Sequence, residues 1–193
     1  KVYPIDEDEL KVPRFEIPKH WRLAYGLDFG WSNPTAAILG AIDNDTDTVY
    51  LCDAYYRAEL PPSEHAESLR RFGAWVPGVC DPSGQSTHPT DGQNLMEIYA
   101  QHGIILTKAE NSVEAGLMTV LERMRAGKLK VFDDLEPFWH EFRTYRRGKG
   151  GKIVKTNDHL MDAMRYLIVS GLTLARCEPM KAPPRRVGDW RTV

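Results

Sequence analysis

Three apolar runs, separated only by short polar turns, constrain the fold of this chain more than any other feature. The runs cover residues 23–29, 35–42 and 48–56, and Asn44-Asp45-Thr46-Asp47 forms the second turn. Short turns of this kind join neighbouring antiparallel strands, so the runs predict an antiparallel meander. The fold must therefore contain a β-sheet.

After the meander, the pattern changes to helices that alternate with short apolar strands. Ser63, Asp91 and Ser112 are the predicted N-caps of the first three helices. The predicted helices cover 63–75, 91–102, 112–127, 134–145 and 157–175, and the predicted strands cover 76–80, 103–106 and 129–132. Alternation of this kind after a meander predicts a mixed α/β sheet with helices on its faces.

The two ends of the chain lack this pattern. Residues 1–20 contain three prolines and the acidic run Asp6-Glu7-Asp8-Glu9, and they are predicted to form a linker. The chain starts at Lys1 instead of Met, so we expect it to be part of a longer protein. Residues 176–193 are rich in Pro and Arg and predict a mobile tail. The domain itself is expected to cover 21–175.

Composition excludes several classes of protein. No run approaches the roughly 18 consecutive apolar residues of a membrane-spanning helix, and the N-terminus has no secretion signal. Cys52, Cys80 and Cys177 lie far apart with no zinc-ligand spacing, so neither a disulfide framework nor a structural zinc site is expected. A reducing, cytoplasmic location fits this use of cysteine.

Charge is distributed unevenly along the chain. Residues 1–142 carry 13 basic and 23 acidic side chains, whereas residues 143–193 carry 12 and 4. The densest basic segment has no acidic residue and comprises Arg143, Arg146, Arg147, Lys149, Lys152 and Lys155. It predicts contacts to successive DNA phosphates, and a solvated loop is the alternative. Nearby aromatic residues at helical spacing predict packing more than base stacking; they are Trp139, Phe142 and Tyr145.

Two aspartates stand at the ends of apolar strands. Asp28 lies near the end of the run 23–29, and Asp81 follows the apolar pair Val79-Cys80 directly. A carboxylate in such a place costs several kcal/mol unless it is paired or bound to a metal. Each aspartate alone is more simply a turn former or a helix cap. Together, they could meet at the carboxyl edge of one sheet.

The last predicted helix supplies further candidate ligands. Asp158 and His159 precede Asp162 by four and three positions, so all three residues lie close to one helix face. Asp158 alone would be an N-cap, and His159 alone a surface residue. Combined with Asp28 and Asp81, the aspartates offer oxygen ligands for Mg²⁺ or Mn²⁺, and pairs of these ions promote phosphodiester hydrolysis.

The sequence contains neither the phosphate-binding loop of an ATPase nor a motif that reads DNA bases. The run 148–152 lacks the spacing of a phosphate-binding loop, so this chain by itself is not expected to hydrolyse ATP. No base-reading motif appears either, and cleavage with little sequence preference is expected.

These residues together resemble a known family. The segments Gly26-Leu27-Asp28-Phe29-Gly30, Cys80-Asp81-Pro82-Ser83-Gly84 and 158–166 look like those of the nuclease domain of the large terminase subunit of tailed bacteriophages. The resemblance covers about residues 21–175. It implies an RNase H-like fold, with Asp28, Asp81 and Asp162 as metal-binding acids. It also matches His159 to a histidine that often precedes the last acid by three positions.

The resemblance also implies a biological setting. Such nucleases cut concatemeric viral double-stranded DNA at the start and end of packaging, in the cytoplasm of the infected bacterium. An upstream ATPase domain of the same chain, a small terminase subunit and a portal protein would be the partners. The basic tail would resemble the extension that contacts the portal.

Three alternatives stay open at this point. A resolvase or transposase would share the RNase H-like fold, since fold does not determine function. A sugar-kinase or actin-like half would share a strand ending in Asp-x-Gly, but 193 residues leave no room for its second half. A domain that only grips DNA would need no intact acids.

Overall fold

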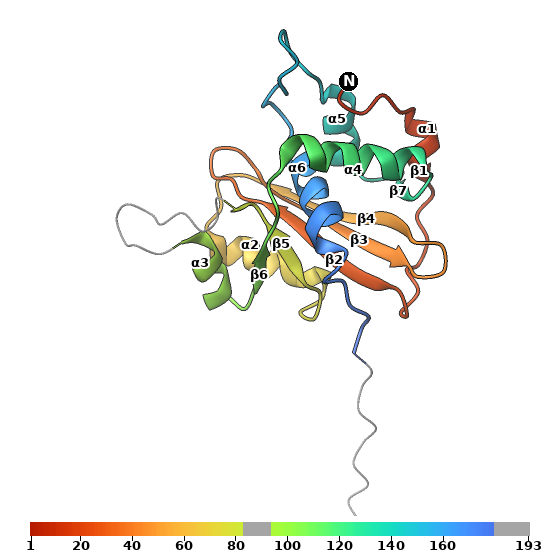
Figure 1. Ribbon diagram of the computed structural model, residues 1–193. Helices are drawn as coiled ribbons and strands as arrows, with labels where there is room; N and C mark the ends of the chain where they lie inside the picture. Colours follow the sequence, from red (N-terminus) through yellow and green to blue (C-terminus); the bar gives the residue numbers. More distant parts are fainter. Residues whose placement is uncertain (83–93, 180–193) are drawn as a thin grey trace, which may run out of the picture.

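The computed structural model describes residues 1–82 and 94–179. Its centre is a seven-stranded sheet in the order β1-β7-β4-β3-β2-β5-β6 (Figure 1). The strands are β1 (Lys11–Val12), β2 (Arg22–Asp28), β3 (Thr35–Asp43), β4 (Thr48–Arg57), β5 (Gly78–Cys80), β6 (Leu106–Lys108) and β7 (Leu129–Phe132). β3 is antiparallel to β2 and β4, and the other neighbours are parallel. The predicted meander and mixed α/β sheet are confirmed.

Helices cover both faces of the sheet. They are α1 (Glu7–Leu10), α2 (Pro62–Leu69), α3 (Leu95–Gln101), α4 (Val113–Arg125), α5 (Glu136–Thr144) and α6 (His159–Tyr166). α6 crosses β2 and β3 with α4 and α5 beside it, while α2 and α3 lie on the opposite face (Figure 1). The predicted packing role of Trp139, Phe142 and Tyr145 is confirmed, because all three are buried.

Several element boundaries differ from those predicted. α2 begins after Pro61 rather than at Ser63, and it narrows into a short 3₁₀ helix that ends before Gly73. The second predicted N-cap, Asp91, lies outside the described residues, and α3 is capped by Asn94 through a capping box with Glu97.

The later elements differ for identifiable reasons. Gly103, at φ +82°, and Ile104 close the end of α3, so β6 begins at Leu106 instead of 103. The last helix is regular only over α6 and continues as a wider π-helical turn, Leu167–Gly171.

The first twenty residues pack on the domain, although a linker was predicted. β1 pairs with β7, Leu10 is fully buried, and the ring of Tyr3 stacks 6.3 Å from that of Phe142. The strand β7 would otherwise present an open edge, and isolated apolar residues within a polar segment are enough to cover it. Such scattered anchors leave no periodic signal in the sequence.

The cysteines and the lengths of the helices bear on two expectations from the sequence, about disulfides and about membrane-spanning helices. Cys52 and Cys80 are buried free thiols, and Cys177 is an exposed one. Within residues 1–82 and 94–179, no helix is long and apolar enough to cross a membrane.

Gly26 lets α6 approach the sheet closely. A Cβ atom at this position would lie 1.9 Å from the carbonyl oxygen of Ala163, which belongs to the backbone of α6. Helix and strand therefore meet backbone to backbone, and no side-chain rotation could relieve the clash. This contact determines how far α6 stands above β2.

We expect Gly26→Ala to lower the free energy of unfolding by about 2 kcal/mol or more, because α6 must shift away from β2. Urea unfolding measures this quantity. The matched control is Gly148→Ala, where the new Cβ would make an ordinary contact 3.4 Å from Val154 Cγ2. Equal stability of the two variants would contradict the proposed packing constraint.

Candidate active site

Asp28 and Asp81 lie side by side at one edge of the sheet. Asp28 is the last residue of β2, and Asp81 directly follows β5, which pairs with β2 in parallel. The backbone N–H of Asp81 donates to the carbonyl of Leu27 at 3.1 Å, which continues the pairing to the strand ends. The predicted meeting of these two residues at a carboxyl edge is therefore observed.

α6 brings the other candidates to the same edge. His159, its first residue, has Nδ1 2.9 Å from Asp28 Oδ2. Asp158 and Asp162 are buried, with 4% and 7% of their surface exposed. Asp158 occupies the N-cap position, but its side chain makes no capping hydrogen bond, contrary to the simple interpretation of this residue.

Burial dominates the electrostatics of Asp28. Burial is the largest cause that raises the pKa of this carboxyl, the hydrogen bond to His159 opposes it, and the nearby charges of Asp162 and Asp81 add to it; the net pKa is about 6. The same hydrogen bond raises the pKa of His159 above its usual value. The aspartates from β2, β5 and α6 are thus close enough to act on one another.

Basic side chains neutralise the acids of α6. Lys155 Nζ lies 2.8 Å from Asp162 Oδ2 and 3.1 Å from Asp158 Oδ2. Arg165, which is almost fully buried, donates to Asp162 Oδ1 at 3.0 Å. Partial burial by itself would lower the pKa of Lys155, but the hydrogen bond to Asp162 and the charge of Asp158 leave it raised.

The acids do not enclose a ready-made metal site in this arrangement. Among residues 1–82 and 94–179, no three His, Cys, Asp or Glu side chains form a group able to hold a metal ion. Their chemistry nevertheless fits a hard cation, because they offer carboxylate oxygens and because the Lys155 ammonium already lies between two of them as a stand-in cation.

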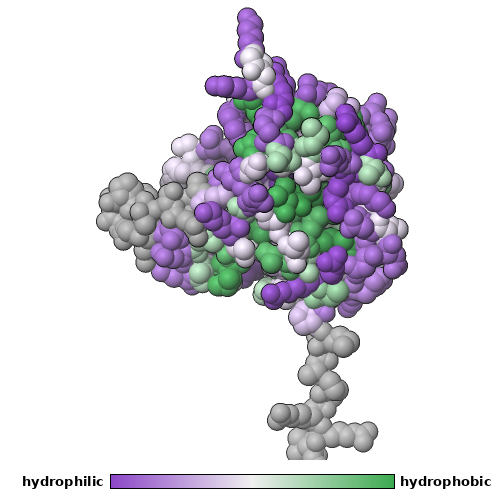
Figure 2. All heavy atoms as spheres, in the orientation of Figure 1, coloured by the Kyte–Doolittle hydropathy of each residue, from purple (hydrophilic) through white to green (hydrophobic). Residues whose placement is uncertain are grey.

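The basic segment is divided by the structure into two groups. Three members form ion pairs within the chain: Arg143 with Glu7, Arg147 with Glu114, and Lys155 with the site acids. Arg146, Lys149 and Lys152 are exposed and form no ion pair within the described residues. They lie on a hairpin held by the Arg147–Ile153 bridge. The hairpin projects from the body in Figure 1, and this projection is largely hydrophilic in Figure 2.

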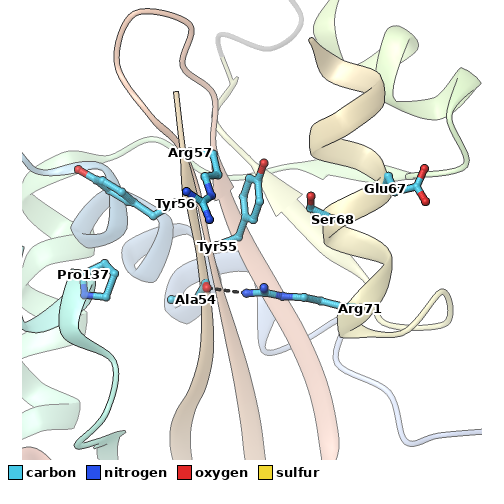
Figure 3. A pocket seen from close by; sticks show the side chains of 8 residues that line it. All are labelled: Ala54, Tyr55, Tyr56, Arg57, Glu67, Ser68, Arg71 and Pro137. Carbon is cyan, nitrogen blue, oxygen red and sulfur yellow. Dashed lines mark hydrogen bonds between the residues drawn. The ribbon is translucent and has the colours of Figure 1, made fainter. Parts of the chain in front are cut away.

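A separate hollow of about 560 Å³ lies between β4 and α2. Its lining includes Tyr55, Arg57 and Arg71, and the Arg71 guanidinium donates to the carbonyl of Ala54 at 2.6 Å (Figure 3). None of the predicted site residues lines it.

Two residues that contact the candidate site were not predicted from the sequence. Arg165 was absent from the predicted site, although its spacing of three from Asp162 could have indicated the pair. Glu141 lies on α5, and its Oε2 accepts hydrogen bonds from the backbone N–H groups of Leu160 and Met161. No local sequence signal indicates this contact between Glu141 and the start of α6.

Comparisons with known proteins match most of the chain. Residues 25–170 match the family model described as terminase RNaseH-like domain. The large terminase subunits of Salmonella phage P22 and Enterobacteria phage LP7 are each 33% identical over 173 residues, or 86% of this chain. The chain spans only 35% and 36% of the length of these two subunits.

Solved structures share the fold. The nuclease domain of the phage P22 large terminase is 33% identical, with a TM-score of 0.83 over 92% of this chain and 94% of that one. The large terminase of the thermophilic phage D6E, in complex with ADP, is 25% identical, with a TM-score of 0.75 over 89% of this chain and 44% of that one. Two more distant nuclease domains, at 19% and 16% identity, are from phage SPP1 with bound Mn and phage G20c with bound cobalt.

We expect Asp28→Asn to stabilise the protein in the presence of a metal chelator. A carboxyl whose pKa is higher in the folded state stabilises the fold while it is protonated, and this contribution is lost as the pH rises through about 6. The amide does not ionise, so the variant should gain up to about 3 kcal/mol above pH 6, and the gain should shrink toward pH 4.

Urea unfolding between pH 4 and 8 measures this difference. Asp45→Asn, in the exposed turn between β3 and β4, is the matched control and should show no such dependence on pH. An Asp28→Asn variant less stable than the parent at pH 8 would contradict the electrostatic account.

Proposed function

The chain belongs to the terminase RNaseH-like domain family, and from this premise we propose that it is the nuclease domain of a phage large terminase subunit. In this proposal, it is a metal-dependent endonuclease that cuts concatemeric viral double-stranded DNA to begin and end genome packaging. The observation that carries the proposal is the meeting of Asp28, Asp81 and α6 at one sheet edge, with His159 hydrogen-bonded to Asp28.

The proposed metal ligands are Asp28, Asp81 and Asp162, together with Asp158. Their carboxylate oxygens suit Mg²⁺ or Mn²⁺, and we propose that they hold two such ions. Bound ions would supply activation of water and stabilisation of the leaving oxygen of the phosphodiester. The Mn and cobalt in the SPP1 and G20c domains support the use of a divalent cation.

The remaining residues of the chain would place the substrate. His159, beside Asp28, would orient water or contact the scissile phosphate. Arg143, Arg146, Arg147, Lys149, Lys152 and Lys155 are proposed to bind DNA phosphates, with the three unpaired side chains of the hairpin as the first contacts. Because Lys155 pairs with the site acids, we propose that it leaves them when a metal binds.

The whole large subunit would supply the other packaging activities. We propose that an ATPase domain precedes this chain and that residues 1–20 lead from it to the nuclease domain, predicted over 21–175, against which they pack. The tail, 176–193, would reach the portal protein, and the small terminase subunit would be a further partner. ATP hydrolysis is assigned to the part of the subunit outside this chain. The location is the cytoplasm of the infected bacterium.

One observation favours a second candidate function. Lys155 and Arg165 already neutralise Asp162, so a domain that only grips DNA would have a stable site without metal. Digestion of plasmid DNA with Mg²⁺, Mn²⁺ or EDTA separates the two proposals, because a DNA-gripping module would bind plasmid without cutting it.

We expect Asp28→Asn, Asp81→Asn and Asp162→Asn each to reduce metal-dependent cleavage of plasmid by about 100-fold or more. The amide keeps the shape of the side chain but loses the charge that holds the cation. Asp45→Asn is the matched control and should cut at the parental rate. If any two of the three site variants also cut at that rate, the proposed ligand set is wrong.

We expect the exposed hairpin residues to determine DNA affinity. Replacing Arg146, Lys149 and Lys152 together by Gln should reduce the slope of log affinity against log salt by about 0.9 for each lost phosphate contact on duplex DNA. Arg147 stays unchanged in this variant because its pairing with Glu114 and its hydrogen bond to the Gly151 carbonyl hold the hairpin.

A charge-matched control isolates the hairpin from the net charge of the protein. In this control, Gln replaces three exposed basic residues outside the hairpin: Lys19, Arg70 and Arg125. Filter binding or fluorescence anisotropy at several salt concentrations measures both slopes. Equal slopes of log affinity against log salt for the two triple variants would contradict the proposed DNA contacts and identify the hairpin as a solvated loop.

A further inference from the structure

Glu141 is a buried acid that the proposed mechanism does not use. It lies on α5 with 1% of its surface exposed, among the aromatic residues that pack α5 against the core. A carboxylate in such surroundings costs free energy unless strong hydrogen bonds compensate for the lost water. Its partners therefore indicate why this residue is charged at all.

The partners of Glu141 are at the start of α6. Its Oε2 accepts from the backbone N–H of Leu160 at 2.7 Å and from that of Met161 at 3.3 Å. The first N–H groups of a helix have no acceptor within the helix, and the residue at the N-cap usually supplies one. Asp158 does not supply it. Glu141 thus caps α6 from a different helix.

The surroundings of Glu141 hold its carboxylate in this pose. Burial raises the pKa of Glu141, and Tyr56 of β4 acts in the opposite direction without cancelling this effect. Figure 3 shows Tyr55 and Tyr56 leaving β4 on opposite sides, with Tyr55 nearer α2. Oε1 has no hydrogen bond of good geometry within the described residues. The two amides of α6 are therefore hydrogen-bonded through Oε2 alone.

We infer that Glu141 is a positioning residue of the active site. Leu160 and Met161 lie between His159 and Asp162, so fixing their amides fixes the rotation and height of the first turn of α6. That turn determines whether His159 reaches Asp28 and whether Asp162 faces the same edge. The effect on cleavage rests on the proposed nuclease function, whereas the capping contact is independent of that function.

Amide hydrogen exchange measured by NMR tests the cap without any activity assay. Glu141→Met keeps the volume but removes the acceptor, so exchange at Leu160 and Met161 should accelerate by about tenfold or more. Glu141→Gln keeps an acceptor oxygen and should retain most of the protection. Glu136→Met, at an exposed position of the same helix, is the control and should change neither amide.

The imidazole signals of His159, recorded in chelator, test positioning directly. They should move in Glu141→Met and return close to the parental position in Glu141→Gln. Unchanged signals in the Met variant, or unchanged protection of both amides, would overturn the inference. Because these measurements need no cleavage, they decide the inference even if the parent protein fails to cut DNA, an outcome that would contradict only the proposed function.

Cleavage kinetics then separate positioning from a general loss of stability. In the parent, Glu141→Met should slow cleavage about 10- to 100-fold through displacement of His159 and Asp162. In a His159→Ala background, the factor by which Glu141→Met slows cleavage should be at least about fivefold smaller, because one of the side chains that Glu141 positions is already missing. Fully additive losses would assign Glu141 a structural role only.

Discussion

The need to hold several carboxylates away from water is the constraint on which the rest of the site depends. Asp28, Glu141, Asp158 and Asp162 are all buried around the start of α6. Each has a compensating partner: the His159 imidazole for Asp28, backbone amides for Glu141, and cationic side chains for the other two. Since acids and partners come from β2, α5, α6 and the segment that joins the basic hairpin to α6, these contacts hold four segments together.

Close packing of α6 on β2 turns this electrostatic requirement into a defined geometry. The absence of a side chain at Gly26 lets the two backbones touch, and Ala163 provides the matching surface on the helix. Gly116 on α4 likewise leaves room for a close neighbour, because a Cβ atom there would lie 2.9 Å from the aliphatic part of the Arg165 side chain. Arg165 is thereby confined between two helices, with its guanidinium on Asp162.

The cations that neutralise the acids also connect the site to the DNA-binding surface that we propose. Lys155 follows the hairpin in the chain, and Arg147 pins that hairpin to α4 through Glu114. A phosphate backbone drawn to the exposed hairpin would therefore reach a segment that contacts Asp158 and Asp162. If the proposed DNA binding holds, this arrangement would explain why a basic segment lies between the second and third acids of the sequence.

Local patterns in the sequence determined the meander, the alternation of strands and helices, and the position of Asp28 and Asp81 at strand ends. Each of these features depends on residues within a few positions of one another, so hydrophobic periodicity and turn chemistry could reveal them. The spacing of Asp158, His159 and Asp162 likewise indicated one helix face. The roles of these residues as metal ligands stay a prediction.

Only the tertiary structure decided which partners these residues have. His159 meets Asp28 across 131 positions of sequence, and Arg143 meets Glu7 across 136. The cap of α6 comes from Glu141 instead of Asp158, and β1, within the first twenty residues, pairs with β7 and covers its edge. Contacts of this kind arise when distant segments pack together, and no periodicity within either segment records them.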